Sequence, residues 1–71
     1  MNESKYEVIL YWDKVDEIFV AEVPELPGCM AHGETKTQAI QHAETAIELW
    51  LETAREDGVA IPEPRGRLLY A

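Results

Sequence analysis

Basic residues are scarce in this sequence, which has 6 Lys and Arg against 14 Asp and Glu and a formal net charge of −8 at pH 7. Nucleic-acid affinity comes largely from Lys and Arg side chains that displace counterions from phosphates. Direct binding to DNA or RNA is therefore not expected. A single cysteine, Cys29, rules out an internal disulfide and favours a reducing compartment.

Long apolar runs are also missing, since none approaches the roughly 20 residues of a membrane-spanning helix. Residues 1–5 lack the basic and apolar regions of a secretory signal. An apolar content of 46% nevertheless argues against a disordered acidic chain. The 71 residues predict one small, soluble, cytoplasmic domain with no membrane contact.

Short stretches rich in β-branched and aromatic residues predict three strands, at residues 6–12, 18–23 and 29–32. The polar residues 13–17 have the length of a hairpin connection. Apolar groups occupy both faces of the first stretch, so we expect that strand to be covered on both sides or to lie centrally in its sheet. A final strand is expected at residues 59–61.

A helix is the plainest predicted element. Thr35 and Gln38 fit a capping box, and Gly58 is placed to end the helix. Apolar residues at helical spacing predict a stripe that faces the core: Ala39, Ile40, Ala43, Ile47, Trp50, Leu51 and Ala54. The order β-β-β-α-β predicts an α+β fold, with one long helix packed on one face of a mostly antiparallel sheet. Residues 1–64 would form this domain and residues 65–71 a short tail.

The candidate soft metal ligands are Cys29, His32 and His42. Cys29 and His32 would point to opposite faces of a strand, and His42 lies off the apolar stripe, so a metal site is not expected. Cys29 is interpreted as a packed thiol and not as a nucleophile, because its surroundings are acidic. The sequence has no phosphate-binding, serine-elbow or HExxH motif, and it predicts neither catalysis nor a cofactor.

Four glutamates recur at every fourth position of the predicted helix: Glu44, Glu48, Glu52 and Glu56. Like charges at this spacing destabilise an isolated helix by about 0.2–0.5 kcal/mol per pair. One interpretation is a solvated face opposite the core. The other is an acidic surface that attracts a basic partner, for which Glu44, Glu48 and Glu52 are the candidate contact residues.

Self-association as a dimer or tetramer is expected from the small size of the domain and from the open edges of its sheet. Leu49 lies outside the predicted stripe of the helix, and the tail carries Leu68-Leu69-Tyr70. Both features would add apolar surface that a second subunit could bury.

A distinctive run joins the second and third predicted strands. It reads Phe19-Val20-Ala21-Glu22-Val23-Pro24-Glu25-Leu26-Pro27-Gly28-Cys29. With Gly33-Glu34-Thr35 and the amphipathic helix that follow, the run resembles the HicB-like antitoxin family over residues 5–62.

The resemblance implies a partial ribonuclease-H-like fold for the β-β-β-α-β order. It also implies that the motif residues shape the fold: Pro24, Leu26, Pro27, Gly28, Cys29, Gly33 and Thr35. Family members typically neutralise HicA, a small basic toxin that cleaves mRNA, by covering it. The resemblance thus implies a non-catalytic antitoxin-type module with a HicA-like toxin as its partner. Longer members add a C-terminal DNA-binding domain, whereas only residues 65–71 follow Pro64, so operator binding is not expected.

Two other functions stay open. One is an orphan structural module that self-associates without a toxin. The other is a degraded metal-dependent nuclease that uses Glu7, Glu22 or the hairpin aspartates Asp13 and Asp16. The lack of a catalytic motif disfavours this enzyme.

Overall fold

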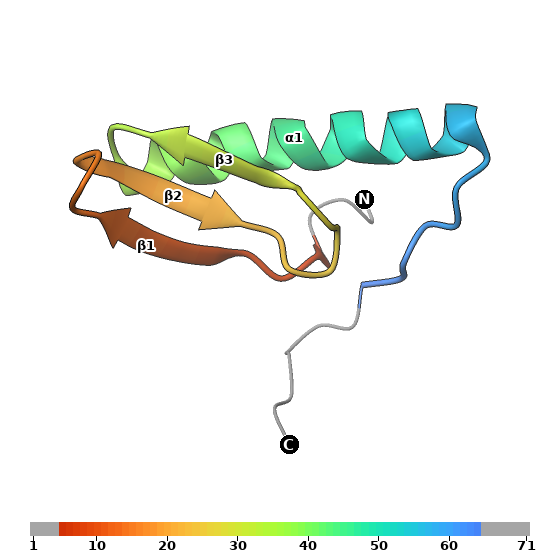
Figure 1. Ribbon diagram of the computed structural model, residues 1–71, viewed down its shortest axis with the longest axis horizontal. Coiled ribbons are helices and arrows are strands. Elements are labelled where there is room, and N and C mark those ends of the chain that lie inside the picture. The colour runs from red at the N-terminus through yellow and green to blue at the C-terminus, as the bar shows by residue number, and fades with distance from the viewer. Residues whose placement is uncertain (1–4, 65–71) are drawn as a thin grey trace, which may run out of the picture.

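The computed structural model describes residues 5–64. Its elements are β1 (Ile9–Asp13), β2 (Ile18–Glu22), β3 (Met30–Gly33) and α1 (Lys36–Asp57). The strands form one antiparallel sheet in the order β1-β2-β3, and α1 lies along one face of it (Figure 1). The predicted α+β fold, with one long helix on an antiparallel sheet, is confirmed. No helix among residues 5–64 has the length and apolarity to cross a membrane.

The expected strand at residues 59–61 is wrong, because residues 59–64 form no regular secondary structure. Pro62 and Pro64 lack the backbone N–H that a strand ladder needs. The side chain of Tyr6 instead holds this segment, donating a hydrogen bond to the carbonyl oxygen of Pro62. The predicted tail at residues 65–71, including Leu68-Leu69-Tyr70, lies outside the described residues.

The expected position of the first strand is also wrong, because β1 lies at an edge of the sheet and α1 covers only one of its faces. Leu10 pairs with Ala21, and both pack towards α1. Ile9 and Tyr11 point to the opposite face and are exposed. Apolar side chains on both faces therefore do not make β1 a central strand.

Two groups of buried side chains join the sheet to α1. The smaller consists of Ala21, Ala39 and Ala43, whose small side chains let the helix approach β2 and β3 closely. The larger group fills the space between the loop after β2 and the C-terminal half of α1: Tyr6, Val23, Leu26, Cys29, Ile47 and Leu51.

The ends of α1 are capped much as the sequence predicts. Thr35 Oγ1 accepts a hydrogen bond from the backbone N–H of Gln38 at 3.0 Å. The Gln38 side chain accepts from the N–H of Glu34 at 2.6 Å, one residue before the position that a regular capping box uses. At the other end, the N–H of Gly58 bonds to the carbonyls of Ala54 and Arg55.

The core-facing stripe of α1 is confirmed for its buried residues, Ala39, Ala43, Ile47, Leu51 and Ala54. The inclusion of Ile40 is wrong, because 39% of its surface is exposed. Ile40 lies in the second turn of α1, where the core is closed by alanines and leaves no room for a larger side chain.

The two edges of the sheet differ. His42 on α1 donates its Nδ1 hydrogen to the carbonyl oxygen of His32 at 2.7 Å, so the helix covers this part of the β3 edge. Within residues 5–64, no strand pairs with the outer edge of β1. That edge therefore presents unpaired backbone groups.

Candidate partner-binding site

The loop between β2 and β3 is held by three backbone hydrogen bonds. Val23 N donates to Cys29 O at 3.0 Å, Leu26 N to Val23 O at 3.1 Å, and Cys29 N to Leu26 O at 2.9 Å. Gly28 has a φ of 79°, a backbone conformation that residues other than glycine rarely adopt. The resulting turn brings Leu26 into the core, where it is fully buried.

Trp50 joins this loop to α1. Its indole Nε1 donates a hydrogen bond to the carbonyl oxygen of Pro27 at 2.9 Å, which fixes the plane of the ring. Together with the buried Leu26 and Cys29, this contact attaches the loop to the core beside α1.

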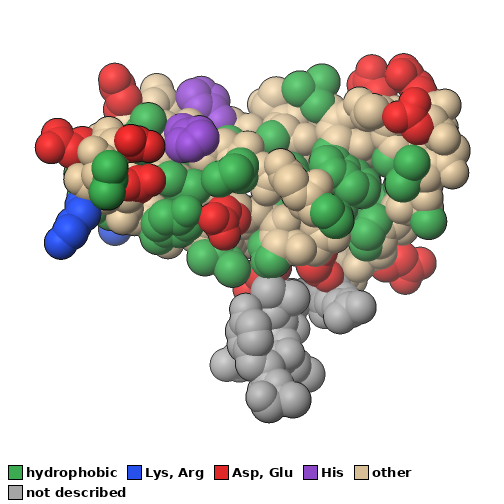
Figure 2. Space-filling view, in the orientation of Figure 1, with side chains coloured by type: hydrophobic (Ala, Val, Ile, Leu, Met, Phe, Trp, Pro, Cys, Tyr) green, Lys and Arg blue, Asp and Glu red, His purple; other side chains and the backbone are tan. Residues whose placement is uncertain are grey.

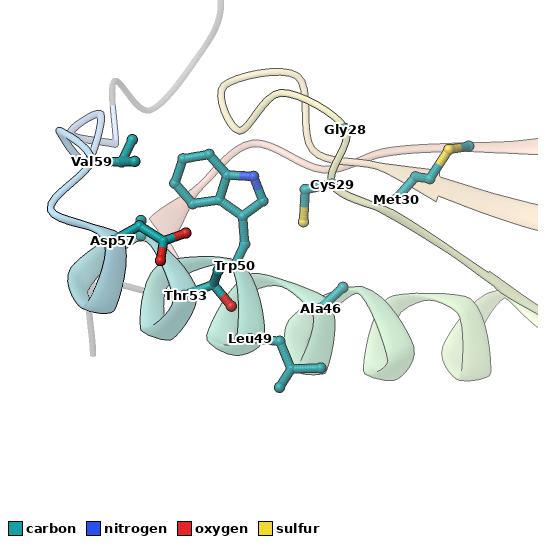
Figure 3. A pocket seen from close by; sticks show the side chains of 10 residues that line it. Gly28, Cys29, Met30, Ala46, Leu49, Trp50, Thr53, Asp57 and Val59 are labelled. Carbon is teal, nitrogen blue, oxygen red and sulfur yellow. The ribbon is translucent and has the colours of Figure 1, made fainter.

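A groove of about 450 Å³ opens between the loop and the C-terminal half of α1. Its lining residues are Gly28, Cys29, Met30, Ala46, Leu49, Trp50, Thr53, Ala54, Asp57 and Val59. Trp50 stands between the loop that carries Gly28 and the C-terminal end of α1, where Asp57 and, just after the helix, Val59 lie (Figure 3). The groove is open to solvent and largely apolar.

Cys29 lines this groove as a packed side chain and not as a reactive thiol. Only 6% of the residue surface is exposed, and burial raises the pKa of the thiol. A raised pKa keeps the thiol neutral and weakly nucleophilic near neutral pH. This agrees with the interpretation of Cys29 as a packed side chain.

The candidate contact residues Glu44, Glu48 and Glu52 are all exposed on α1, as is Glu56. None of their side chains forms a hydrogen bond or ion pair with another residue of the described part of the chain. Arg55 provides the only positive charge in the last turn of the helix. The structure thus places these carboxylates on the surface of α1.

Acidic side chains are prominent near both ends of the face shown in Figure 2, with exposed apolar side chains between them. The two histidines, in purple, lie together on the same face. This face therefore presents both apolar and acidic side chains.

The other acidic candidates serve local structure. Asp13 Oδ1 accepts hydrogen bonds from the N–H groups of Val15 and Asp16, at 3.0 and 3.2 Å, and so shapes the hairpin. Glu22 accepts a hydrogen bond of 2.9 Å from the Tyr11 hydroxyl. This bond, with partial desolvation and the nearby charges, raises the pKa of Tyr11.

Cys29, His32 and His42 do not converge on one point, since Cys29 is buried and both histidines are exposed. Among the described residues, no three His, Cys, Asp or Glu side chains are grouped closely enough to hold a metal ion. Glu7 lies in the segment before β1, where its backbone N–H donates to Glu25 Oε1 at 3.4 Å.

The sequence did not predict the groove or the position of Asp57 in its lining. A partial signal was present, because Leu49, Thr53 and Asp57 follow each other at helical spacing beside the core stripe. The opposite wall comes from the loop, however, and its position depends on Leu26 and Trp50 reaching the same core.

Comparisons with known proteins identify the family of this chain. The family described as "HicB_like antitoxin of bacterial toxin-antitoxin system" matches residues 6–67. A UPF0150 protein of Thermoplasma acidophilum is 38% identical over 58 residues, which cover 82% of this chain and 83% of that protein. A UPF0150 protein of Synechocystis is 43% identical over 44 residues, 62% of this chain and 60% of its own length.

An uncharacterised 14.9 kDa protein of Haemophilus phage HP1 is 35% identical over 51 residues. The match covers 72% of this chain but only 38% of the phage protein. No solved structure matches the chain significantly. The family match covers most of the chain and includes the loop, the groove and α1, so this chain belongs to the HicB-like antitoxin family of bacterial toxin–antitoxin systems.

Proposed function

We propose that this chain is a non-catalytic antitoxin module that inhibits a small, basic, HicA-like, mRNA-cleaving toxin by direct protein contact in the cytoplasm. The observation that carries this proposal is the row of exposed glutamates on α1, whose side chains have no partner within residues 5–64, in a member of an antitoxin family. A basic toxin would meet this surface with complementary charge, which speeds association and selects the partner. The net charge of −8 acts in the same direction.

The direct test is co-expression with a HicA-like toxin. The toxin alone should arrest growth, and the chain should restore growth and co-purify with the toxin. If an active toxin is neither neutralised nor bound, the proposal is overturned. An orphan module without a toxin would give that negative result.

The surface itself is tested by replacing Glu44, Glu48 and Glu52 with Lys. A matched control replaces Asp16, Glu34 and Glu63 with Lys, because these residues are also exposed and the change in total charge is the same. We expect the first variant to lose growth rescue and the control to retain most of it. Equal loss of growth rescue in both variants would mean that inhibition depends on the total charge of the chain and not on this face of α1.

Self-association belongs to the same proposal. Unpaired backbone groups on the outer edge of β1 and exposed apolar residues on the open face of the sheet support a dimer or tetramer. Residues 1–64 are proposed as the antitoxin domain. The ribonuclease-H-like relationship stays a prediction.

A further inference from the structure

The groove between α1 and the loop after β2 combines apolar walls with one charged side chain. Asp57 is the only acidic or basic residue among the residues that line it. Trp50 and Leu49 contribute the largest apolar side chains from α1, and 60% of the Leu49 surface is exposed. A ligand that fits this lining has a long apolar part and a positive end.

We propose that the groove takes an arginine or lysine side chain of the basic toxin partner. The aliphatic stem lies against Leu49 and Trp50, and the cationic head lies at Asp57. This inference rests on the proposed function and names the part of α1 at which the toxin docks.

The stem of such a side chain finds a preformed surface. Trp50 is held in place by its hydrogen bond to Pro27 O, so its ring needs no rearrangement on binding. Lys and Arg commonly bury their methylene stems against apolar surface while the charged head stays in a polar environment. The face of an indole also attracts a cation.

The head finds a site that favours positive charge for two reasons. The side chain of Asp57 makes no hydrogen bond or ion pair with another described residue. It is also the last residue of α1, where the helix dipole is negative and a carboxylate is unfavourable for the helix. A cation at Asp57 relieves this repulsion. Glu52 and Glu56, in the last two turns of α1, add to the negative potential.

A second copy of the chain fits the groove less well. It would bring a molecule of net charge −8 against an acidic surface of the same kind. Like charges brought together across an interface oppose association. Charge complementarity therefore favours the basic toxin as the occupant.

The first test compares Asp57→Asn with Glu34→Gln by calorimetric titration of the full chain with a purified HicA-like toxin. Both variants remove one exposed negative charge, at opposite ends of α1. Asp57→Asn should weaken binding about tenfold, and Glu34→Gln less than twofold. The melting temperature of Asp57→Asn should be unchanged or higher, because the helix dipole no longer meets a carboxylate. If Asp57→Asn binds more weakly but is as stable as the wild type, Asp57 contacts the toxin and does not act by stabilising the fold.

The second test compares Leu49→Ala with Ile40→Ala. Leu49 and Ile40 are both exposed on α1, but only Leu49 lines the groove. Leu49→Ala should weaken binding several-fold and Ile40→Ala should not. If Asp57→Asn and Leu49→Ala bind the toxin as tightly as the wild-type chain does, the groove inference is overturned and the proposed function stands. If the wild-type chain does not bind, the proposed function fails first. A change in the chain's own oligomeric state on Asp57→Asn would identify a second copy as the occupant and overturn the inference.

Discussion

At the scale of single residues, Gly33 shows how the absence of a side chain determines the packing of a whole helix. A Cβ atom at this position would lie 2.3 Å from the backbone nitrogen of Ala39 and 2.8 Å from its Cα. Both are backbone atoms of α1, so no side chain can rotate away to make room. The end of β3 and the first turn of α1 can meet this closely only if residue 33 is glycine.

We therefore expect Gly33→Ala to destabilise the protein by about 3 kcal/mol, because the helix must move away from the sheet. Gly58→Ala is the matched comparison. Nothing lies within 4 Å of a Cβ at Gly58, and only its φ of 70° is unfavourable for alanine. Its effect should be about 1 kcal/mol. Urea unfolding measures both, and equal effects would contradict a steric role for Gly33.

The burial of Cys29 leads to a pH prediction. Burial raises the pKa of the thiol in the folded state, so the unfolded chain loses its proton at a lower pH than the folded chain does. The stability linked to the neutral thiol is thus present below the ordinary thiol pKa and decreases as the pH rises through it. Iodoacetamide should alkylate the native chain more slowly than the urea-unfolded chain at pH 8. Equal rates in both states would refute the packed environment of Cys29.

At the scale of elements, α1 is held by contacts at both ends and along one face. Thr35 caps its N-terminus, Trp50 ties its middle to the loop, and Gly58 ends it. The glutamates on its outer face oppose helix formation, since like charges lie one turn apart. Packing of the buried face therefore has to provide most of the stability of this helix.

The contribution of the N-terminal cap can be measured with Thr35→Ala. The variant loses the acceptor for the N–H of Gln38 and should destabilise the protein by about 1 kcal/mol. Thr37→Ala is the control, because Thr37 is exposed within the first turn and alanine is the better helix former. In thermal unfolding, the melting temperature of Thr35→Ala should lie below that of the wild type. The melting temperature of Thr37→Ala should lie at or above it. A Thr35→Ala variant as stable as Thr37→Ala would rule out a stabilising cap.

At the scale of the whole molecule, the three strands and one helix of residues 5–64 leave one face of the sheet without a covering element from this part of the chain. The face opposite α1 exposes Ile9, Tyr11 and Met30, and the outer edge of β1 is unpaired within residues 5–64. A domain of this size also buries only about 60% of the surface of its unfolded chain. A second subunit on this side would cover both the apolar face and the open edge.

If β1 is the site of self-association, Ile9→Lys should shift the protein towards monomer without unfolding it. Val15→Lys is the control, because Val15 is 89% exposed in the hairpin turn away from the open face. Sedimentation velocity at micromolar concentration separates the species. A monomeric wild-type protein would contradict self-association, and an unchanged oligomer in Ile9→Lys would move the interface elsewhere.

Much of this architecture was predictable because it depends on local patterns. The hairpin, the third strand, the capped helix and the burial of Ala39, Ala43 and Ile47 all follow from residue spacing. The position of β1 was not predictable, because exposed and buried apolar side chains look alike in a sequence. The strand expected at residues 59–61 failed because the following prolines remove ladder donors, which outweighed the β propensity of Val59 and Ile61.

The sequence by itself determined the fold class, the helix with its acidic face and the family motif, since each rests on residues close together in the chain. Tertiary structure alone decided which edge of the sheet is free and where the groove lies. The groove requires Trp50 on α1 to meet Pro27 in a loop 23 residues earlier, and Asp57 to lie beside that contact. Such a meeting depends on how the buried side chains pack together, and residue spacing along the chain does not record it.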